Sequence, residues 1–147
     1  MRQEPDATIT SERDALGQYL DYQRETVLLK TEGLTKDQFA QRIPTSDLTL
    51  AGLLYHLALV EEAWFEEEFL GRQPREDWVA IDWEADPSYE WRTALDKDPE
   101  WLRRRYGDAC DRARQVAAEA PSLDALSVKN RADGKPFTLR WVMLHLI

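Results

Sequence analysis

The sequence contains very little cysteine and histidine. Its 147 residues include one cysteine, Cys110, and two histidines, His56 and His145. A single cysteine excludes an intramolecular disulfide, and nothing in the chain points to an oxidising compartment. Cys110 lies beside an apolar helix face without a basic neighbour close enough to favour a thiolate, so we interpret it as a small packing residue.

Long apolar runs and an excess of positive charge are also missing. No segment is apolar enough to span a bilayer, and the N-terminal residues do not resemble a signal peptide. The formal net charge of −9 disfavours binding to nucleic acid or to anionic membranes. There is no glycine-rich phosphate loop, no Ser-His-Asp order and no cysteine pair, which weakens nucleotide-binding, hydrolase and redox interpretations. We therefore expect a cytoplasmic protein without nucleic-acid or membrane partners.

The residues that are present suit one folded domain. Apolar residues make up 43% of the chain and six are tryptophan, so a substantial core can form. We expect a single domain over residues 1–147, with residues 1–10 as a flexible tail. Helical periodicity, caps and breakers predict four main helices and one short helix, at residues 12–31, 35–41, 50–70, 99–120 and 138–147.

These helices predict an all-α fold, an up-and-down four-helix bundle. Asp98 followed by Pro99 is the clearest start signal, and Gly71 is a natural stop. No strand alternation is evident, so residues 121–137 are expected to form a loop. The last helix is apolar almost all round, which predicts a central position, and it runs to Ile147 without a stop signal. It therefore looks incomplete.

Residues 71–98 form a long irregular connection between the second and third main helices. Acidic and aromatic residues alternate there without a helical or strand period, and one short helix is expected near residues 89–95. Connections of this length are uncommon in compact domains and often functional. This one could cover a pocket at the end of the bundle.

His56 is the most informative residue for chemistry. It lies between Leu53 and Val60 on what should be the inner wall of the second main helix. A buried imidazole needs partners for its nitrogens, which are either structural groups or a metal ion, and the sequence leaves both open. For His145 the structural interpretation is stronger. The acidic run 66–68 and the basic run 103–105 are expected to be solvated helix faces, and Gln23 either lines a pocket or lies at the solvent edge.

Two segments resemble a known family. Residues 49–65 are similar to the second helix of DinB-like proteins, and residues 137–147 are similar to the start of their last helix. The branch with the closest pattern includes mycothiol-dependent maleylpyruvate isomerase. The resemblance implies a four-helix bundle with a divalent metal at one end, most often Zn²⁺, with Ni²⁺ or Fe²⁺ as alternatives. It makes His56 one metal ligand and places the other two, four residues apart, just beyond Ile147.

The resemblance also implies a function. It suggests a metal-dependent thiol S-transferase or isomerase-like enzyme that joins a small thiol such as mycothiol to an electrophilic substrate, working as a homodimer. His145 matches a histidine one turn before the missing ligand pair and is not itself a ligand, and no catalytic residue is assigned. Two alternatives remain: a non-catalytic, stress-associated bundle that binds a metal or small ligand, and a structural dimerisation domain.

Overall fold

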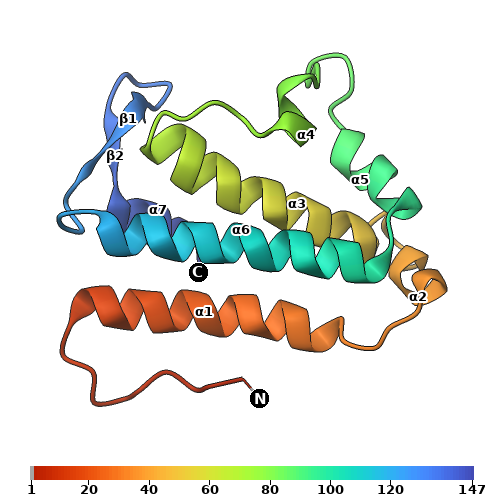
Figure 1. Cartoon of the computed structure of the whole chain (residues 1–147), viewed down its shortest axis with the longest axis horizontal. Helices are drawn as coiled ribbons and strands as arrows, with labels where there is room; N and C mark the ends of the chain where they lie inside the picture. The colour runs from red at the N-terminus through yellow and green to blue at the C-terminus, as the bar shows by residue number, and fades with distance from the viewer. Residues whose placement is uncertain (1) are drawn as a thin grey trace.

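A computed structural model describes residues 2–147 and shows a mostly helical chain (Figure 1). The long helical segments are α1 (Glu12–Lys30), α3 (Leu50–Glu62) with its π-helical continuation η1 (Ala63–Phe69), α6 (Pro99–Glu119) and α7 (Leu139–Leu146). The shorter elements are α2 (Lys36–Ala40), α4 (Glu76–Val79), α5 (Tyr89–Thr93), η2 (Ala94–Asp96), β1 (Leu126–Asn130) and β2 (Pro136–Thr138). The helices expected from periodicity are therefore confirmed.

Side-chain caps explain where the helices begin. The Ser11 hydroxyl accepts a hydrogen bond from a backbone N–H in the first turn of α1, and the Thr49 hydroxyl does the same for α3 at 3.0 Å. Thr35 forms a complete capping box at α2. Asp98 accepts from two backbone N–H groups at the start of α6, with Pro99 in the first turn. Each cap satisfies N–H groups that lack a partner inside the helix.

Each main helix packs against one or more of the others. α3 lies along α6, α1 contacts both α6 and α7, and α7 contacts η1. The core has two clusters of buried side chains. The first lies between α3 and α6 and includes Leu54, Tyr55 and Leu102, and the second lies between α1, η1 and α7 and includes Phe65 and Val142.

The absence of strands is the clearest prediction that was wrong. Residues 126–138 form an antiparallel hairpin in which Leu126 pairs with Thr138. The strands have five and three residues, too short for an alternating pattern to be recognised. Tertiary contact stabilises the hairpin, because the buried ring of Phe137 packs edge-on against Trp64 of η1 at 5.1 Å.

The N-terminal segment contacts α1. The Arg2 guanidinium lies 3.9 Å from the Tyr22 ring centroid and the Asp6 N–H donates to the Gln18 side chain, and the flexibility expected of residues 1–10 stays a prediction. α7 is not buried all round, since the Leu144 side chain is 55% exposed. No helix in residues 2–147 is both long enough and apolar enough to cross a membrane.

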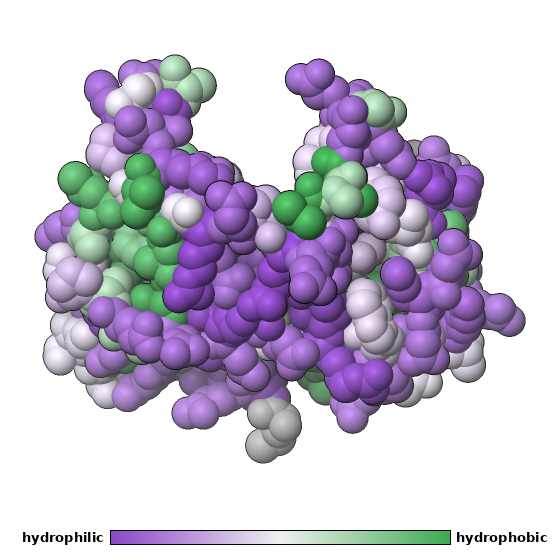
Figure 2. Space-filling view, turned by 45° about the horizontal axis from the view of Figure 1, so that its top comes forward, coloured by the Kyte–Doolittle hydropathy of each residue, from purple (hydrophilic) through white to green (hydrophobic). Residues whose placement is uncertain are grey.

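The surface carries two projections with a hollow between them (Figure 2). The β1–β2 hairpin forms one projection, and the segment between α4 and α5 forms the other. The floor of the hollow is mainly hydrophilic, and hydrophobic residues lie at the base of the projection on the right of the view. On the hairpin, Leu126 and Val128 are exposed and add hydrophobic surface.

Three glutamates are buried where α3 continues into η1. Glu61, Glu62 and Glu66 are each no more than 5% exposed, so the expectation that residues 66–68 are all solvated is wrong for Glu66. Arginines from other elements neutralise them. The expectation for the run 103–105 is wrong in the same way, because Arg105 binds Glu62 and only Arg104 is exposed. Such pairs are long-range and leave no local pattern in the sequence.

Candidate functional site

His56 lies at the edge of α3 and not on its inner wall. Its side chain is 36% exposed, and its Nδ1 lies 3.0 Å from the Oε1 of Glu90. Within residues 2–147, Nδ1 is the only nitrogen of this ring with a hydrogen-bond partner. The ring is therefore not enclosed by aliphatic side chains, and Nε2 remains available to a ligand.

The short helix α5 supplies both groups that hold His56. Glu90 approaches Nδ1, and the indole of Trp91, the next residue, stacks on the imidazole with centroids 4.6 Å apart and planes 25° apart. α5 lies in the connection that the sequence marked as a possible cover for a pocket, and the short helix expected near residues 89–95 is confirmed. Sequence reasoning missed Glu90 and Trp91, because the alternation of acids and aromatics in this segment does not single out two of them.

Glu90 is buried with one oxygen unpaired. Only 4% of the residue is exposed, and its Oε2 has no hydrogen-bond partner among the described residues. Most buried polar atoms in folded proteins are paired, so an unpaired carboxylate oxygen beside an oriented histidine calls for an explanation. Such exceptions are concentrated at functional sites.

Gly52 allows α5 to reach α3. A Cβ atom built at Gly52 would lie 2.7 Å from the Cε3 of Trp91, which is closer than real carbon contacts allow. We expect Gly52→Ala to push Trp91 away from His56 and to lower the free energy of unfolding by about 1–3 kcal/mol, as for other overpacked sites. Urea denaturation measures the loss.

Gly17 is the matched control for this prediction. It also lies inside a helix, but a Cβ atom there would meet nothing within 4 Å. Gly17→Ala should therefore raise the free energy of unfolding by about 0.4–1 kcal/mol, because alanine restricts the unfolded chain and favours helix. If both variants changed stability in the same direction, close packing of Trp91 on Gly52 would not be the cause.

Comparison with known proteins places the chain in a family. The sequence profile described as mycothiol-S-transferase matches residues 15–147, which span every helix from α1 to α7 and include His56 and Glu90. The chain belongs to the mycothiol-S-transferase family. No curated protein and no solved structure matches it. The resemblance to a mycothiol-dependent branch of DinB-like proteins is confirmed, and with it a thiol-transferase type of function.

The only cysteine of this mycothiol-S-transferase family member is not a candidate nucleophile. Cys110 is 1% exposed, and burial, followed by the nearby Glu61 carboxylate, raises the pKa of its thiol to about 12. The thiolate is the reactive form, so at neutral pH almost none of this thiol can react. The packing role expected for Cys110 fits its buried position.

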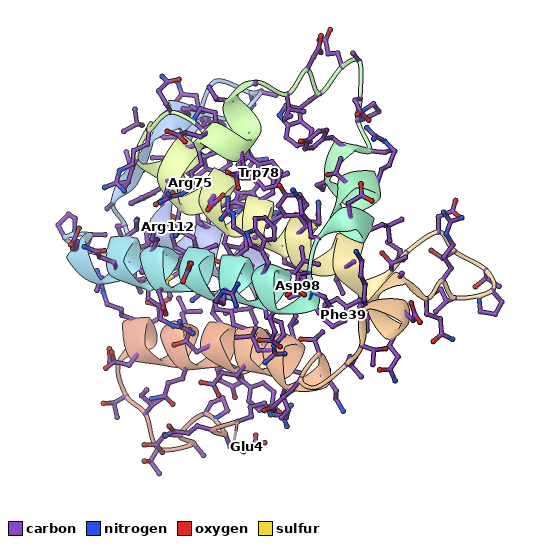
Figure 3. All side chains as sticks on the ribbon, turned by 45° about the vertical axis from the view of Figure 1, so that its right-hand side comes forward. Glu4, Phe39, Arg75, Trp78, Asp98 and Arg112 are labelled. Carbon is purple, nitrogen blue, oxygen red and sulfur yellow. The ribbon has the colours of Figure 1, made fainter. Side chains whose placement is uncertain are left out.

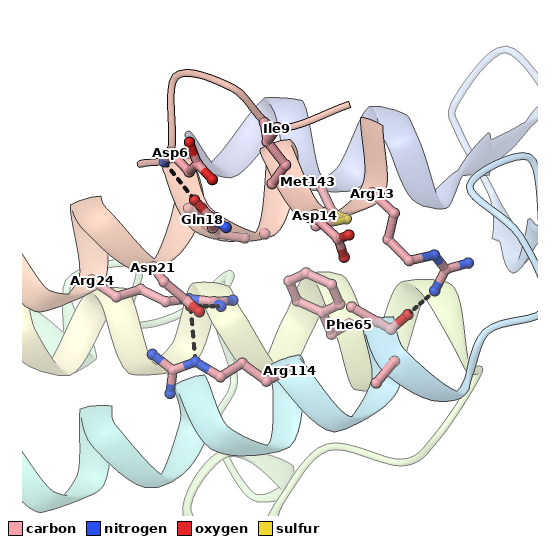
Figure 4. A pocket seen from close by; sticks show the side chains of 14 residues that line it. Asp6, Ile9, Arg13, Asp14, Gln18, Asp21, Arg24, Phe65, Arg114 and Met143 are labelled. Atoms are coloured by element: carbon pink, nitrogen blue, oxygen red, sulfur yellow. Dashed lines mark hydrogen bonds and ion pairs between the residues drawn. The ribbon is translucent and has the colours of Figure 1, made fainter. Parts of the chain in front are cut away.

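One large cavity does not include His56. It has a volume of about 560 Å³ and lies between the N-terminal segment, α1, α6 and α7 (Figure 4). Asp21 in its lining accepts hydrogen bonds from Arg24 and Arg114, and no buried side-chain nitrogen or oxygen of the lining lacks a partner among residues 2–147. Because it lacks an unpaired group of the kind found at Glu90, we base the candidate site on His56 and not on cavity size.

A smaller cavity lies close to His56. It has a volume of about 140 Å³ and is walled in part by Leu57 and Val60 of α3 and by Leu146 of α7. Val60 is one helical turn from His56 and so shares its side of α3. Gln23 lines this cavity and is also exposed to solvent. The two positions that the sequence left open for it, a pocket wall and the solvent edge, therefore both apply.

The described residues do not complete a metal site. In residues 2–147, no group of three His, Cys, Asp or Glu side chains is arranged to hold a metal ion. His145 is exposed, stacks on Trp141 with centroids 4.7 Å apart and meets the edge of Trp64. His56 therefore has no second or third potential metal ligand beside it in the part of the chain that the structure describes.

Proposed function

We propose that this protein is a divalent-metal-dependent thiol S-transferase, or a closely related isomerase, that uses a small thiol such as mycothiol and an electrophilic substrate. His56 is the proposed metal ligand, and its arrangement with Glu90 is the observation that carries the proposal. Metal-bound histidines almost always donate their second ring nitrogen to a carboxylate, a backbone carbonyl or water. An imidazole held in this way through Nδ1 is prepared to bind a cation through Nε2.

The remaining ligands are proposed to follow Ile147, as the family resemblance implies. The direction of α7 supports this. Trp141 and His145 both pack against Trp64, and Leu146 lies beside Leu57 and Val60, so α7 runs antiparallel to α3 towards His56. At about 1.5 Å per residue, one to two further turns would pass His56. The four main helices would then form the DinB-like bundle.

The residues of this chain prepare the site in three ways. Glu90 fixes the imidazole by accepting a hydrogen bond from Nδ1, and Trp91 covers one face of the ring. The half-exposed position of His56 leaves room for a thiol to approach from solvent. A divalent cation held there would lower the pKa of a bound thiol and so make it nucleophilic at neutral pH.

Metal analysis of the natural full-length protein tests the proposal. We expect one divalent ion per chain, and transfer of mycothiol to an aryl halide in a spectrophotometric assay. His56→Ala should lose the metal and lower the transfer rate by at least about 100-fold, since loss of a hydrogen-bond partner outside the ligand set already costs about 10–100-fold.

His145→Ala is the matched control, because it removes the other imidazole of residues 1–147, which lies at an exposed position. It should keep both the metal and the activity. Metal without transfer activity would favour the alternative of a non-catalytic metal-binding bundle. Full activity in a metal-free protein, or in His56→Ala, would overturn the proposal. The homodimer remains a separate prediction that light scattering tests.

A further inference from the structure

His56 is held in two perpendicular directions by consecutive residues of α5. The Glu90 carboxylate meets Nδ1 at 3.0 Å, and the Trp91 ring lies nearly parallel to the imidazole at 4.6 Å. The hydrogen bond limits rotation of the imidazole ring within its own plane, and the stacked indole limits tilting of the ring out of that plane. The imidazole therefore has one orientation, set by residues 34 or more positions away in the chain.

The same contact selects one tautomer of the neutral ring. A carboxylate accepts hydrogen bonds and does not donate them, so Nδ1 must carry the proton when it contacts Glu90. The lone pair is then on Nε2, the nitrogen that has no partner among residues 2–147. Free histidine prefers the opposite tautomer, with the proton on Nε2, so this selection requires a specific partner.

Glu90 differs from the other buried glutamates of the chain. Both oxygens of Glu61 are bonded to Arg24, and both oxygens of Glu62 are bonded to arginines. Those two carboxylates neutralise buried cations, as expected of structural ion pairs. Among residues 2–147, Glu90 has no arginine or lysine partner and is hydrogen-bonded through one oxygen only, which leaves Oε2 buried and unpaired. A structural role would leave this costly arrangement unexplained.

We infer that Glu90 is a positioning residue, which fixes the imidazole of His56 as the Nδ1–H tautomer with the Nε2 lone pair directed at the ligand. Trp91 assists by holding the plane of the ring. The importance of this arrangement for metal binding rests on the proposed function, whereas the choice of tautomer does not. The two parts are therefore tested by different measurements.

Long-range ¹H–¹⁵N NMR of the 147-residue chain, at a pH where the rings are neutral, tests the tautomer. The chain has only two histidines, so a His145→Ala variant assigns the His56 signals. We expect the Nδ1–H pattern in the wild-type chain and in Glu90→Gln, whose amide oxygen can still accept from Nδ1. Glu90→Leu should shift His56 towards the Nε2–H pattern. Glu84→Leu, which removes an exposed carboxylate from the same connection, should change nothing.

Zinc titration of the natural full-length protein tests the consequence. Glu90→Leu should weaken Zn²⁺ affinity by about 10–100-fold, with rescue in Glu90→Gln. Circular dichroism checks that each variant is folded, and the tautomer of His56 in the wild-type chain keeps the inference falsifiable if Glu90→Leu does not fold. An Nε2–H pattern in the wild-type chain, or no change in Glu90→Leu, would overturn the inference. The expected tautomers without any zinc binding would support the positioning of His56 and count against the proposed metal function.

Discussion

Glu62→Ala should be among the most destabilising single substitutions in this protein, lowering the free energy of unfolding by about 3–5 kcal/mol. Glu62 is 2% exposed and binds Arg105 and Arg112 of α6, the Arg75 side chain, and the Trp78 indole N–H at 2.8 Å. Figure 3 shows Arg75, Trp78 and Arg112 gathered on the same side of α3. Removal of the carboxylate leaves the mostly buried Arg105 and Arg112 and the buried indole N–H of Trp78 without this partner.

Urea denaturation followed by circular dichroism measures this loss. Glu68→Ala is the matched control, because Glu68 lies in the same helical segment but pairs with Lys129 at the surface, at 3.3 Å. Exposed pairs of this kind contribute about 0–1 kcal/mol. If Glu62→Ala and Glu68→Ala lost similar amounts of stability, the contacts of Glu62 with Arg75, Arg105, Arg112 and Trp78 would not be what holds α4 and α6 on α3.

Arg24 and Glu61 should give the second large effect. Arg24 donates from Nε and Nη2 to the two oxygens of Glu61, at 2.7 and 2.6 Å, and both side chains are almost fully buried. Arg24→Met leaves the Glu61 carboxylate buried without its cation, and Glu61→Leu does the reverse. Each single variant should lose about 3–5 kcal/mol of stability, because an unpaired buried charge is far more costly than a paired one.

The double variant Arg24→Met/Glu61→Leu distinguishes pairing from packing. Replacing both charges by apolar groups of similar size is often neutral or stabilising, so the double variant should be more stable than either single variant. The double-mutant cycle, measured by urea denaturation, gives the coupling energy. Additive losses would mean that the two side chains stabilise the fold by separate contacts, and the ion pair would not be the cause.

These networks explain how a chain with a net charge of −9 forms a compact helical domain. The acids on the inner side of α3 and η1 are matched by arginines from α1, α6 and the connection after η1. This matching holds the connection against α3, and the connection in turn carries α5. The charge network and the candidate site are therefore parts of one arrangement, since α5 supplies Glu90 and Trp91 to His56.

The sequence by itself determined the helices and the residue at the centre of the site. Helix positions follow from short-range physics, because apolar periodicity and capping side chains act within a few residues. The cap at Asp98 is therefore found where it was expected, and Ser11 and Thr49 cap their helices through the same short-range contacts. His56 stood out because it is one of two histidines in the chain, and the pattern around it indicated the family.

Only the tertiary structure decided the partners of these residues. Glu90 is 34 positions from His56, and Arg112 is 50 positions from Glu62, so neither contact has a periodic signature in the sequence. Pairing over such distances depends on how the helices pack, as does burial of Glu66 and formation of the short hairpin. A local sequence pattern indicates which face of a helix is apolar. Which side chains pack against that face depends on the arrangement of all the helices.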